Sequence, residues 1–550
     1  MRKILFLLPL SLLLLTAGCG KESTPQPEPP QPSDGSTTEI AGTAIAPETT
    51  LCGLVADAST GSGIPGVVVS DGFTCVRTDA NGVYQIVRER SHADCVYVTL
   101  PAEYAVPVTS DNHPAFYKKI DMAAAVCRRD FALEPLPAGK EERFALLCIA
   151  DPQCRNDRSV ARFREESIPD IDATARLYDN VYALTLGDIT DNNKTDLWNK
   201  KKASMSNREV VFFQCMGNHD HLNESNRDVT TTYWKSIENY RKYFGPQNYS
   251  FDRGDVHFVV MDNILHGEKP DNGEDMEFAI GFYDWQFEWL CEDLSFVPET
   301  KAVVLCCHAP FRGGTSHCHS DKRYRRKTLE LLSRFAEAHL MIGHTHYTQN
   351  YLHSVGGKTV YEHIHGACCG AFWHATFNRD GTPNGYGVYE FDGAHLASWR
   401  YKGTGCDADE QIRAYDGDYT FYDPHVNVNM SSKPALHTYN YGLKGYIVAN
   451  VWNIEPDGWD VSLWQNGAKV CDMTRFREYD WWVAYWLAEV YGGDGLNGRC
   501  DHLWKGALAD PDAPFEVRAV DRSGRRGPYV ATSVRRNYKG VWGEFDMKTL

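Results

Sequence analysis

Five short groups of acidic, amide and histidine side chains stand in order along the middle of the chain. They are Asp151-Pro152-Gln153, Gly187-Asp188-Ile189-Thr190-Asp191, Gly217-Asn218-His219-Asp220, His308 and Gly343-His344-Thr345-His346. Carboxylate, amide and imidazole donors together suit divalent ions such as Mn, Fe or Zn. Each group alone is common in turns and helix caps, but the ordered set indicates a metal centre.

Each of these groups follows a short apolar run that predicts a buried strand. The runs are residues 144–150, 182–186, 210–215, 302–307 and 340–342, with a further run at 256–261. Polar segments separate the runs, and we predict helices over 285–294 and 328–338. Buried strands that alternate with helices indicate an α/β layered core. Side chains just past the carboxyl ends of such strands meet at one edge, so we expect the five groups to converge.

The ordered set resembles the calcineurin-like metallophosphoesterase superfamily, whose pattern is D-x-H, G-D-x-x-D, G-N-H-D/E, H and G-H-x-H. The resemblance covers about residues 141 to 400. It implies an α/β fold, a four-layer sandwich of two sheets flanked by helices. It also implies a hydrolase of phosphate mono- or diesters that uses two divalent metal ions (Mn, Fe, Zn or similar) and a metal-bridging hydroxide as the nucleophile.

The resemblance implies a ligand role for seven side chains. Asp188 would bridge both metals. One site would be completed by Asp151, Gln153 and His346, and the other by Asn218, His308 and His344. Gln153 departs from the family pattern, which has His at that position. Because an amide oxygen is a neutral, harder and weaker donor than imidazole, we expect this site to bind its metal less tightly and to favour Mn or Mg.

His219 is the catalytic residue that the resemblance implies. It would face the phosphate and either protonate the leaving oxygen or stabilise developing charge. Asp191 is the expected partner that orients His219, and Asp220 is the second candidate.

A glycine-rich segment at residues 366–374 follows the metal motifs. Its glycines allow the backbone to come close to a bound substrate, and Trp373 offers a flat apolar face. We therefore predict that this loop shapes the substrate pocket. Core packing of its aromatic rings is an equal alternative. His374 and Arg312 are the other candidate pocket residues.

The N-terminus carries a targeting signal. Arg2 and Lys3 precede an apolar stretch, residues 4–15, that is too short to span a bilayer and is typical of a signal peptide. Residues 15–19 resemble a lipobox, which implies that Cys19 becomes the lipidated N-terminus of a bacterial lipoprotein; simple secretion is the alternative. We therefore expect an exported lipoprotein anchored to the outer membrane, on its periplasmic or cell-surface side.

The chain divides into five predicted segments. They are residues 1–19 (signal peptide and lipidated Cys), 20–48 (Pro/Ser/Thr-rich linker), 49–137 (N-terminal β-sandwich), 141–405 (metallophosphoesterase domain) and 406–550 (C-terminal β domain). Short β-runs broken by glycine and asparagine turns predict the two flanking β domains. The first of them resembles the transthyretin-like, carboxypeptidase-regulatory type of β-sandwich.

The composition limits the partners of the protein. A net charge of −17 argues against binding to a nucleic acid duplex, which needs a basic surface. An anionic substrate remains compatible, because metal ions supply local positive charge. We expect a small or lipid- or sugar-linked phosphoester, a membrane contact through the N-terminal lipid, and we draw no expectation for the oligomeric state.

Two other functions are open. The enzyme could instead be a pyrophosphatase that acts on a nucleotide or a lipid headgroup. The third possibility is a non-catalytic surface binding lipoprotein with a vestigial metal site, but the complete motif set counts against it.

Seventeen cysteines in an exported chain allow disulfides. We expect the adjacent pairs Cys306-Cys307 and Cys368-Cys369 to be small buried hydrophobic residues instead.

Overall fold

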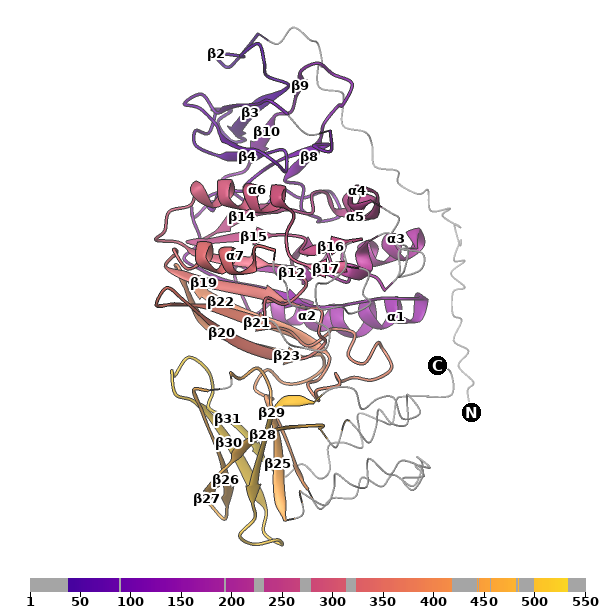
Figure 1. Ribbon diagram of the computed structural model, residues 1–550, viewed down its shortest axis with the longest axis vertical. Helices are drawn as coiled ribbons and strands as arrows, with labels where there is room; N and C mark the ends of the chain where they lie inside the picture. Colours follow the sequence, from indigo (N-terminus) through magenta and orange to yellow (C-terminus); the bar gives the residue numbers. More distant parts are fainter. Residues whose placement is uncertain are drawn as a thin grey trace, which may run out of the picture.

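The computed structural model describes residues 38–88, 91–191, 194–221, 232–267, 278–312, 323–417, 443, 445–455, 457–480, 483 and 499–532. The predicted signal peptide, Cys19 and most of the predicted linker lie outside the described residues. Three regions follow one another along the long axis: an N-terminal β region at the top of Figure 1, an α/β core in the middle and a C-terminal β region at the bottom. Within the described ranges, no helix is both long enough and apolar enough to cross a membrane.

The first sheet of the core has five strands. In spatial order they are β13 (Val211–Cys215), β12 (Val181–Leu186), β11 (Arg143–Ile149), β22 (Gly385–Asp392) and β23 (His395–Gly403). β11, β12 and β13 are parallel, whereas β22 and β23 are antiparallel additions. The parallel strands are apolar throughout because both of their faces are buried: Leu146 belongs to the core between the sheets, and its neighbour Leu147 to the core under the helices.

The second sheet has six strands. In spatial order they are β14 (Tyr249–Arg253), β15 (Val256–Val260), β18 (Ala302–Cys306), β19 (Glu337–Ile342), β21 (Lys358–Ile364) and β20 (Gln349–Val355). The four inner strands are parallel, and both edge strands are antiparallel to their neighbours. The helix predicted over 328–338 is wrong in its second half, because the chain has to enter β19 at Glu337 to pair with β18.

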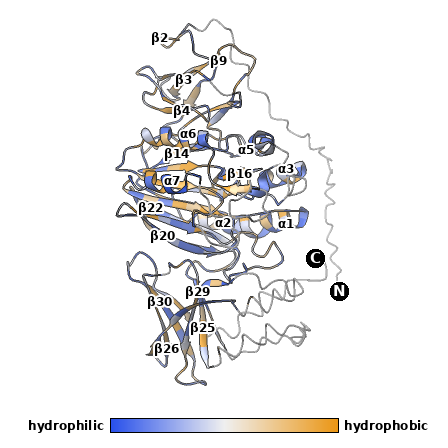
Figure 2. Ribbon diagram, in the orientation of Figure 1, coloured by the Kyte–Doolittle hydropathy of each residue, from blue (hydrophilic) through white to orange (hydrophobic). Residues whose placement is uncertain are grey.

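Helices cover the sheets. Against the first sheet lie α1 (Asp157–Arg162), η1 (Phe163–Ser167), α2 (Ile168–Ala175) and α3 (Thr195–Ser204). Against the second lie α6 (Asp284–Ser295) and α7 (Arg325–Leu332), whose apolar residues join its core. The remaining elements of the core are α4 (Tyr233–Ser236), α5 (Glu238–Phe244), β16 (Ile264–His266) and β17 (Phe278–Ile280). Figure 2 shows hydrophobic residues concentrated in the core strands, while helices such as α1 and α7 mix hydrophilic and hydrophobic residues.

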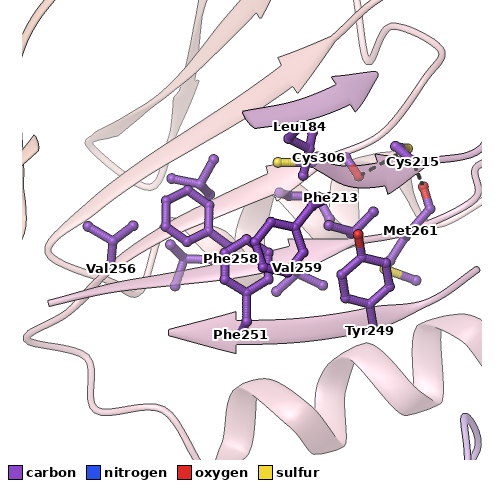
Figure 3. Close-up of a cluster of buried hydrophobic side chains, with 14 of the residues drawn as sticks. Leu184, Phe213, Cys215, Tyr249, Phe251, Val256, Phe258, Val259, Met261 and Cys306 are labelled. Carbon is purple, nitrogen blue, oxygen red and sulfur yellow. Dashed lines mark hydrogen bonds between the residues drawn. The ribbon is translucent and has the colours of Figure 1, made fainter. Parts of the chain in front are cut away.

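The two sheets pack face to face through large apolar side chains (Figure 3). The ring of Phe213 from β13 stacks on Phe251 from β14 with centroids 4.1 Å apart, and Phe251 stacks on Phe258 at 4.9 Å. Burial of each such ring stabilises the fold by roughly 1.5–3 kcal/mol. The layers therefore run helix, sheet, sheet, helix, which confirms the predicted four-layer fold class.

Two small sheets form the N-terminal region. One consists of β10 (Phe131–Leu133), β3 (Leu51–Asp57), β6 (Val83–Ile86) and β9 (Cys127–Arg128), and the other of β5 (Cys75–Arg77), β4 (Val68–Ser70), β7 (Cys95–Val98) and β8 (Tyr117–Lys119). A two-stranded ribbon, β1 (Glu39–Ile40) and β2 (Thr43–Ala44), precedes them. β9 and β10 run parallel to β3, and the other pairings are antiparallel. The region is bonded to the core: Trp289 Nε1 of α6 donates to Ser70 Oγ at 3.1 Å.

The C-terminal region is a sandwich of two antiparallel sheets. One has the order β24 (Ile412–Asp416), β25 (Tyr446–Val451), β29 (Cys500–Ala507) and β28 (Thr474–Glu478), and the other β27 (Ala468–Asp472), β26 (Trp459–Gln465), β30 (Phe515–Asp521) and β31 (Tyr529–Thr532). A separate apolar cluster fills the space between them. In the described part of the chain all fifteen cysteines are free, and the two adjacent pairs are buried as expected for small hydrophobic residues.

Candidate metal centre and substrate pocket

The five motif groups follow β11, β12, β13, β18 and β19 at their carboxyl ends. Their backbone is strained where the side chains turn inward. Positive φ angles occur at Asp151 (46°), Gln153 (39°), Asp188 (49°), His344 (70°) and His346 (59°). A left-handed conformation costs a residue with a side chain on the order of 1–3 kcal/mol, and such strain persists chiefly at functional sites.

Two motif glycines are required by close approach of the acidic side chains. A Cβ at Gly217 would lie 2.3 Å from Asp188 Oδ1, and one at Gly343 would lie 2.7 Å from Asp151 Oδ2. Real Cβ atoms do not come this close to an oxygen. These glycines therefore leave the space in which the carboxylates sit.

Asp151, Asp188 and His346 form one group of donors. One ligand atom from each of the three lies within 4.8 Å of the others. His344 N donates to Asp151 Oδ2 at 2.9 Å, whereas the buried Asp151 Oδ1 accepts no hydrogen bond from the described residues and lies 3.3 Å from His346 Nε2. A buried carboxylate oxygen without a hydrogen bond is costly, and a bound cation would satisfy it. Gln153 lies beside this group, held by its backbone N–H, which donates to Asp188 O at 2.7 Å.

His308, His344 and Asn218 form a second group of donors. His308 Nδ1 donates to Leu186 O at 2.7 Å, which directs Nε2 towards Asn218 Oδ1 at 3.0 Å and Asp188 Oδ2 at 3.4 Å. His344 Nδ1 lies 3.0 Å from the same Asn218 oxygen and 3.2 Å from His308 Nε2. Two imidazole nitrogens and an amide oxygen that converge in this way are a donor set suited to a transition-metal ion.

Buried carboxylates and imidazole rings interact strongly at the centre. Burial opposes a charge on His308, but Asp188 and Asp151 outweigh it and raise the pKa of His308 to about 10. Burial also opposes ionisation of Asp188, yet His308 and His219 hold the pKa of Asp188 well below its usual range. The buried carboxylate, imidazole and amide groups converge as donors for divalent ions, so the residues present fit the metals that the sequence predicts.

Hydrogen bonds of its backbone and of its ring fix the position of His219. Its backbone N–H donates to Asp188 Oδ1 at 2.8 Å, and its ring Nδ1 donates to the carbonyl oxygen of Asp191 at 3.0 Å. The Asp191 carboxylate lies 3.8 Å from Nδ1. Burial lowers the pKa of His219, but Asp188 and Asp191 raise it above its usual value. Of the two partners expected for His219, Asp191 is the one in contact with its ring.

Asp220 holds two motif loops together instead. Its buried carboxylate accepts hydrogen bonds from the backbone N–H groups of Gly217, Ile189 and Thr190 at 3.0–3.1 Å. Burial, with Asp188 second, raises the pKa of Asp220 to about 7. The side chain therefore joins the loop after β12 to the loop after β13.

A pocket of about 470 Å³ opens onto both donor groups. Gly370, Ala371 and Phe372 line it, as the sequence predicts for the segment 366–374, and the residues around it that no motif predicted are Arg155, Phe278, Tyr347 and Arg379. Arg155 lies two residues after Gln153 and Tyr347 directly follows His346, so distance along the chain could have suggested these two. Arg379 carries no comparable sequence signal.

The three residues proposed from the sequence as substrate contacts, Trp373, His374 and Arg312, are not among those that line this pocket. Trp373 is 3% exposed and donates from Nε1 to Pro152 O at 2.8 Å, as the core-packing alternative has it. The Arg312 guanidinium carbon instead lies 3.8 Å from the centroid of the Tyr351 ring.

Three family models match the chain, and the first two overlap at residues 108–136. They are the N terminal of Calcineurin-like phosphoesterase at residues 49–136, Calcineurin-like phosphoesterase at 108–348 and the C terminal of Calcineurin-like phosphoesterase at 362–526. The chain belongs to the calcineurin-like phosphoesterase family, whose members are hydrolases that act on phosphoester bonds. The family predicted from the motifs is thereby confirmed.

Several solved structures are similar to the chain. Purple acid phosphatase from yellow lupin (Lupinus luteus) seeds is 13% identical with a TM-score of 0.34, over 50% of this chain and 53% of that one. Phosphopantetheinyl hydrolase from Mycobacterium tuberculosis is 13% identical with a TM-score of 0.28, over 41% and 90%. The chain thus spans about half the length of the lupin phosphatase it matches. No curated protein sequence matches.

Proposed function

We propose that this protein is a metal-dependent phosphoesterase that hydrolyses a phosphate mono- or diester. The observation that carries the proposal is the convergence of Asp151, Asp188 and His346: the buried Asp151 Oδ1 accepts no hydrogen bond from the described residues and lies 3.3 Å from His346 Nε2. Family membership supports the same reaction class.

Two metal positions follow from the donor groups. Asp151, Gln153 and His346 would hold one divalent ion, Asn218, His308 and His344 would hold the other, and Asp188 would contact both. Divalent ions bound there (Mn, Fe, Zn or similar) supply positive charge to the phosphoryl oxygens and acidify a water molecule.

His219 is the proposed acid for the leaving oxygen. Because its Nδ1–H donates to the Asp191 carbonyl, the ring is held in one orientation and Nε2 is left for the substrate. The backbone N–H of the same residue fixes Asp188. The same residue therefore supplies the proposed acid through its ring and holds the Asp188 carboxylate through its backbone.

Hydrolysis of a pyrophosphate bond in a nucleotide or lipid headgroup is the second candidate. The observation that favours it is the pair of arginines, Arg155 and Arg379, on the pocket wall.

We also propose, from residues 1–19 alone, that the protein is an exported lipoprotein anchored through Cys19 and acts on a small or lipid- or sugar-linked phosphoester. Loss of the protein from the membrane fraction in a Cys19→Ser variant would support the anchor, and unchanged fractionation would contradict it.

The reaction is tested with the full chain loaded with Mn. We expect hydrolysis of p-nitrophenyl phosphate or bis-p-nitrophenyl phosphate, and a loss of roughly 10²–10⁴-fold in kcat for His219→Asn, as for removal of a general acid. Asp188→Asn should lose bound metal, measured by elemental analysis. Asp392→Asn is the matched control, because Asp392 is a half-exposed partner of Arg143. Failure of the metal-loaded protein to hydrolyse either ester, or full activity in Asp188→Asn, would sink the proposal.

A further inference from the structure

Two arginines and a phenylalanine form a wall of the pocket beside the metal ligands. The guanidinium carbons of Arg155 and Arg379 lie 5.5 and 5.6 Å from the centroid of the Phe372 ring. The ring of His346, a proposed metal ligand, lies 5.0 Å from the same centroid. All four residues line one pocket, and we call Arg155, Phe372 and Arg379 the arginine wall.

The loop that carries Phe372 is held rigidly. Phe372 and Trp373 both have left-handed backbone, with φ of 53° and 64°. Trp373 N donates to Cys369 O at 2.7 Å, its Nε1 donates to Pro152 O at 2.8 Å, and Arg162 donates to its carbonyl at 2.5 Å. These hydrogen bonds hold the strained backbone in one conformation. The Phe372 ring, which both guanidinium groups contact, is therefore already in place before a substrate binds.

Two cationic side chains of the arginine wall line the pocket beside the proposed metal ligands. The whole chain has a net charge of −17, yet two guanidinium groups gather at this pocket. Arg155 contacts one carboxylate, that of Asp191, at 3.4 Å. The scissile phosphate already has the proposed metal positions and His219. Planar guanidinium groups recognise phosphate and carboxylate groups through paired hydrogen bonds, so the wall matches a second anionic group.

We propose that the substrate carries a second anionic group besides the scissile phosphate, and that Arg155 and Arg379 bind it. A second phosphate suits the wall best, because several of its oxygens can accept paired hydrogen bonds from planar guanidinium groups. The inference rests on the proposed phosphoesterase function and narrows its substrates to bisphosphates, pyrophosphates and phosphoesters of acidic alcohols.

The test compares four substrates with the Mn-loaded full chain: fructose 1,6-bisphosphate, fructose 6-phosphate, 3-phosphoglycerate and p-nitrophenyl phosphate. We expect kcat/KM for the bisphosphate to exceed that for fructose 6-phosphate by at least about tenfold, the size of one charge-assisted hydrogen-bond pair. Preference for 3-phosphoglycerate would instead assign a carboxylate as the second group.

The arginine variants are compared by the ratio of kcat/KM for fructose 1,6-bisphosphate to kcat/KM for fructose 6-phosphate. Arg379→Gln should lower the preference for the bisphosphate by about tenfold. Arg155→Gln should do the same; because Arg155 also contacts Asp191, any effect through His219 falls on all substrates and cancels in the ratio. Arg176→Gln is the control, since Arg176 is exposed and paired with Glu209 outside the pocket.

The outcomes separate the inference from the function on which it rests. Hydrolysis of p-nitrophenyl phosphate without any preference for a second anion, or a preference that both variants keep, overturns the inference alone. If no ester is hydrolysed, the proposed function fails, and calorimetric titration with inorganic pyrophosphate and with phosphate still decides the inference. Binding of pyrophosphate that Arg379→Gln does not weaken relative to phosphate would overturn it.

Discussion

His257 in β15 lies between two carboxylates in the protein interior, and we predict that it makes stability depend on pH. Its Nδ1 is 2.7 Å from Asp252 Oδ1, and its Nε2 is 2.9 Å from Asp293 Oδ2. Lys301 donates to the other oxygen of Asp252, and Ser250 donates to the other oxygen of Asp293. Burial opposes a charge on the ring, but the two carboxylates raise the pKa of His257 to about 9.

The sign of the effect follows from proton binding. The pKa of His257 is higher in the folded protein than the value of 6.5 for the free side chain, so the folded state holds the proton more tightly. The stabilisation is complete below pH 6.5 and is lost as the pH rises through 9. A shift of this size corresponds to about 3 kcal/mol in the free energy of unfolding.

The assay is urea unfolding of wild type and His257→Gln, followed by circular dichroism at pH 6 and pH 10. Chelator removes metal from both proteins, and subtracting the variant cancels the titration of the metal-ligand histidines. We expect the wild type to exceed the variant in free energy of unfolding by about 3 kcal/mol more at pH 6 than at pH 10. His395→Gln is the control, because His395 is 57% exposed in its pair with Glu337. A stability difference for His257→Gln that stays constant between these pH values would refute the reasoning.

Three further predictions concern the metal centre. Gly217→Ala should lose bound metal and lower kcat by roughly 10²-fold or more, because its Cβ would lie 2.3 Å from Asp188 Oδ1; normal metal content by elemental analysis would contradict this. Asp220→Asn should lower the free energy of unfolding by about 1–3 kcal/mol, because an amide group cannot accept three buried N–H bonds. Thermal denaturation measures this, and an unchanged midpoint would argue against the role of the carboxylate. Gln153→His should slow the loss of metal to a chelator, because imidazole binds transition metals more tightly than an amide oxygen. Equal or faster loss would show that Gln153 is not a ligand.

The motif residues were predictable because their chemistry is local. Asp151, Asp188, Asn218, His308 and His344 each stand one to three residues beyond an apolar run, and parallel strands bring such ends to one edge. Periodicity and donor types therefore predicted an α/β core and a metal centre, and the resemblance of the motif set implied the family and the four layers. Prediction was weaker where pairing across the sheet overrides local preference. Residues 337–338 looked helical, but they belong to β19, because the parallel ladder with β18 needs them.

Tertiary structure alone decided which side chains surround the substrate pocket. Trp373 and Phe372 are neighbours in sequence, yet the strained backbone turns Trp373 into the core and leaves Phe372 on the pocket wall. Arg379 stands more than two hundred residues after Arg155, and only the packing of the 366–374 loop against Pro152 places both beside one ring. Sequence by itself indicated the candidate metal ligands, because ligand types and strand ends depend on local sequence. The folded chain decided the shape and charge of the pocket, because these arise from contacts between segments far apart in sequence.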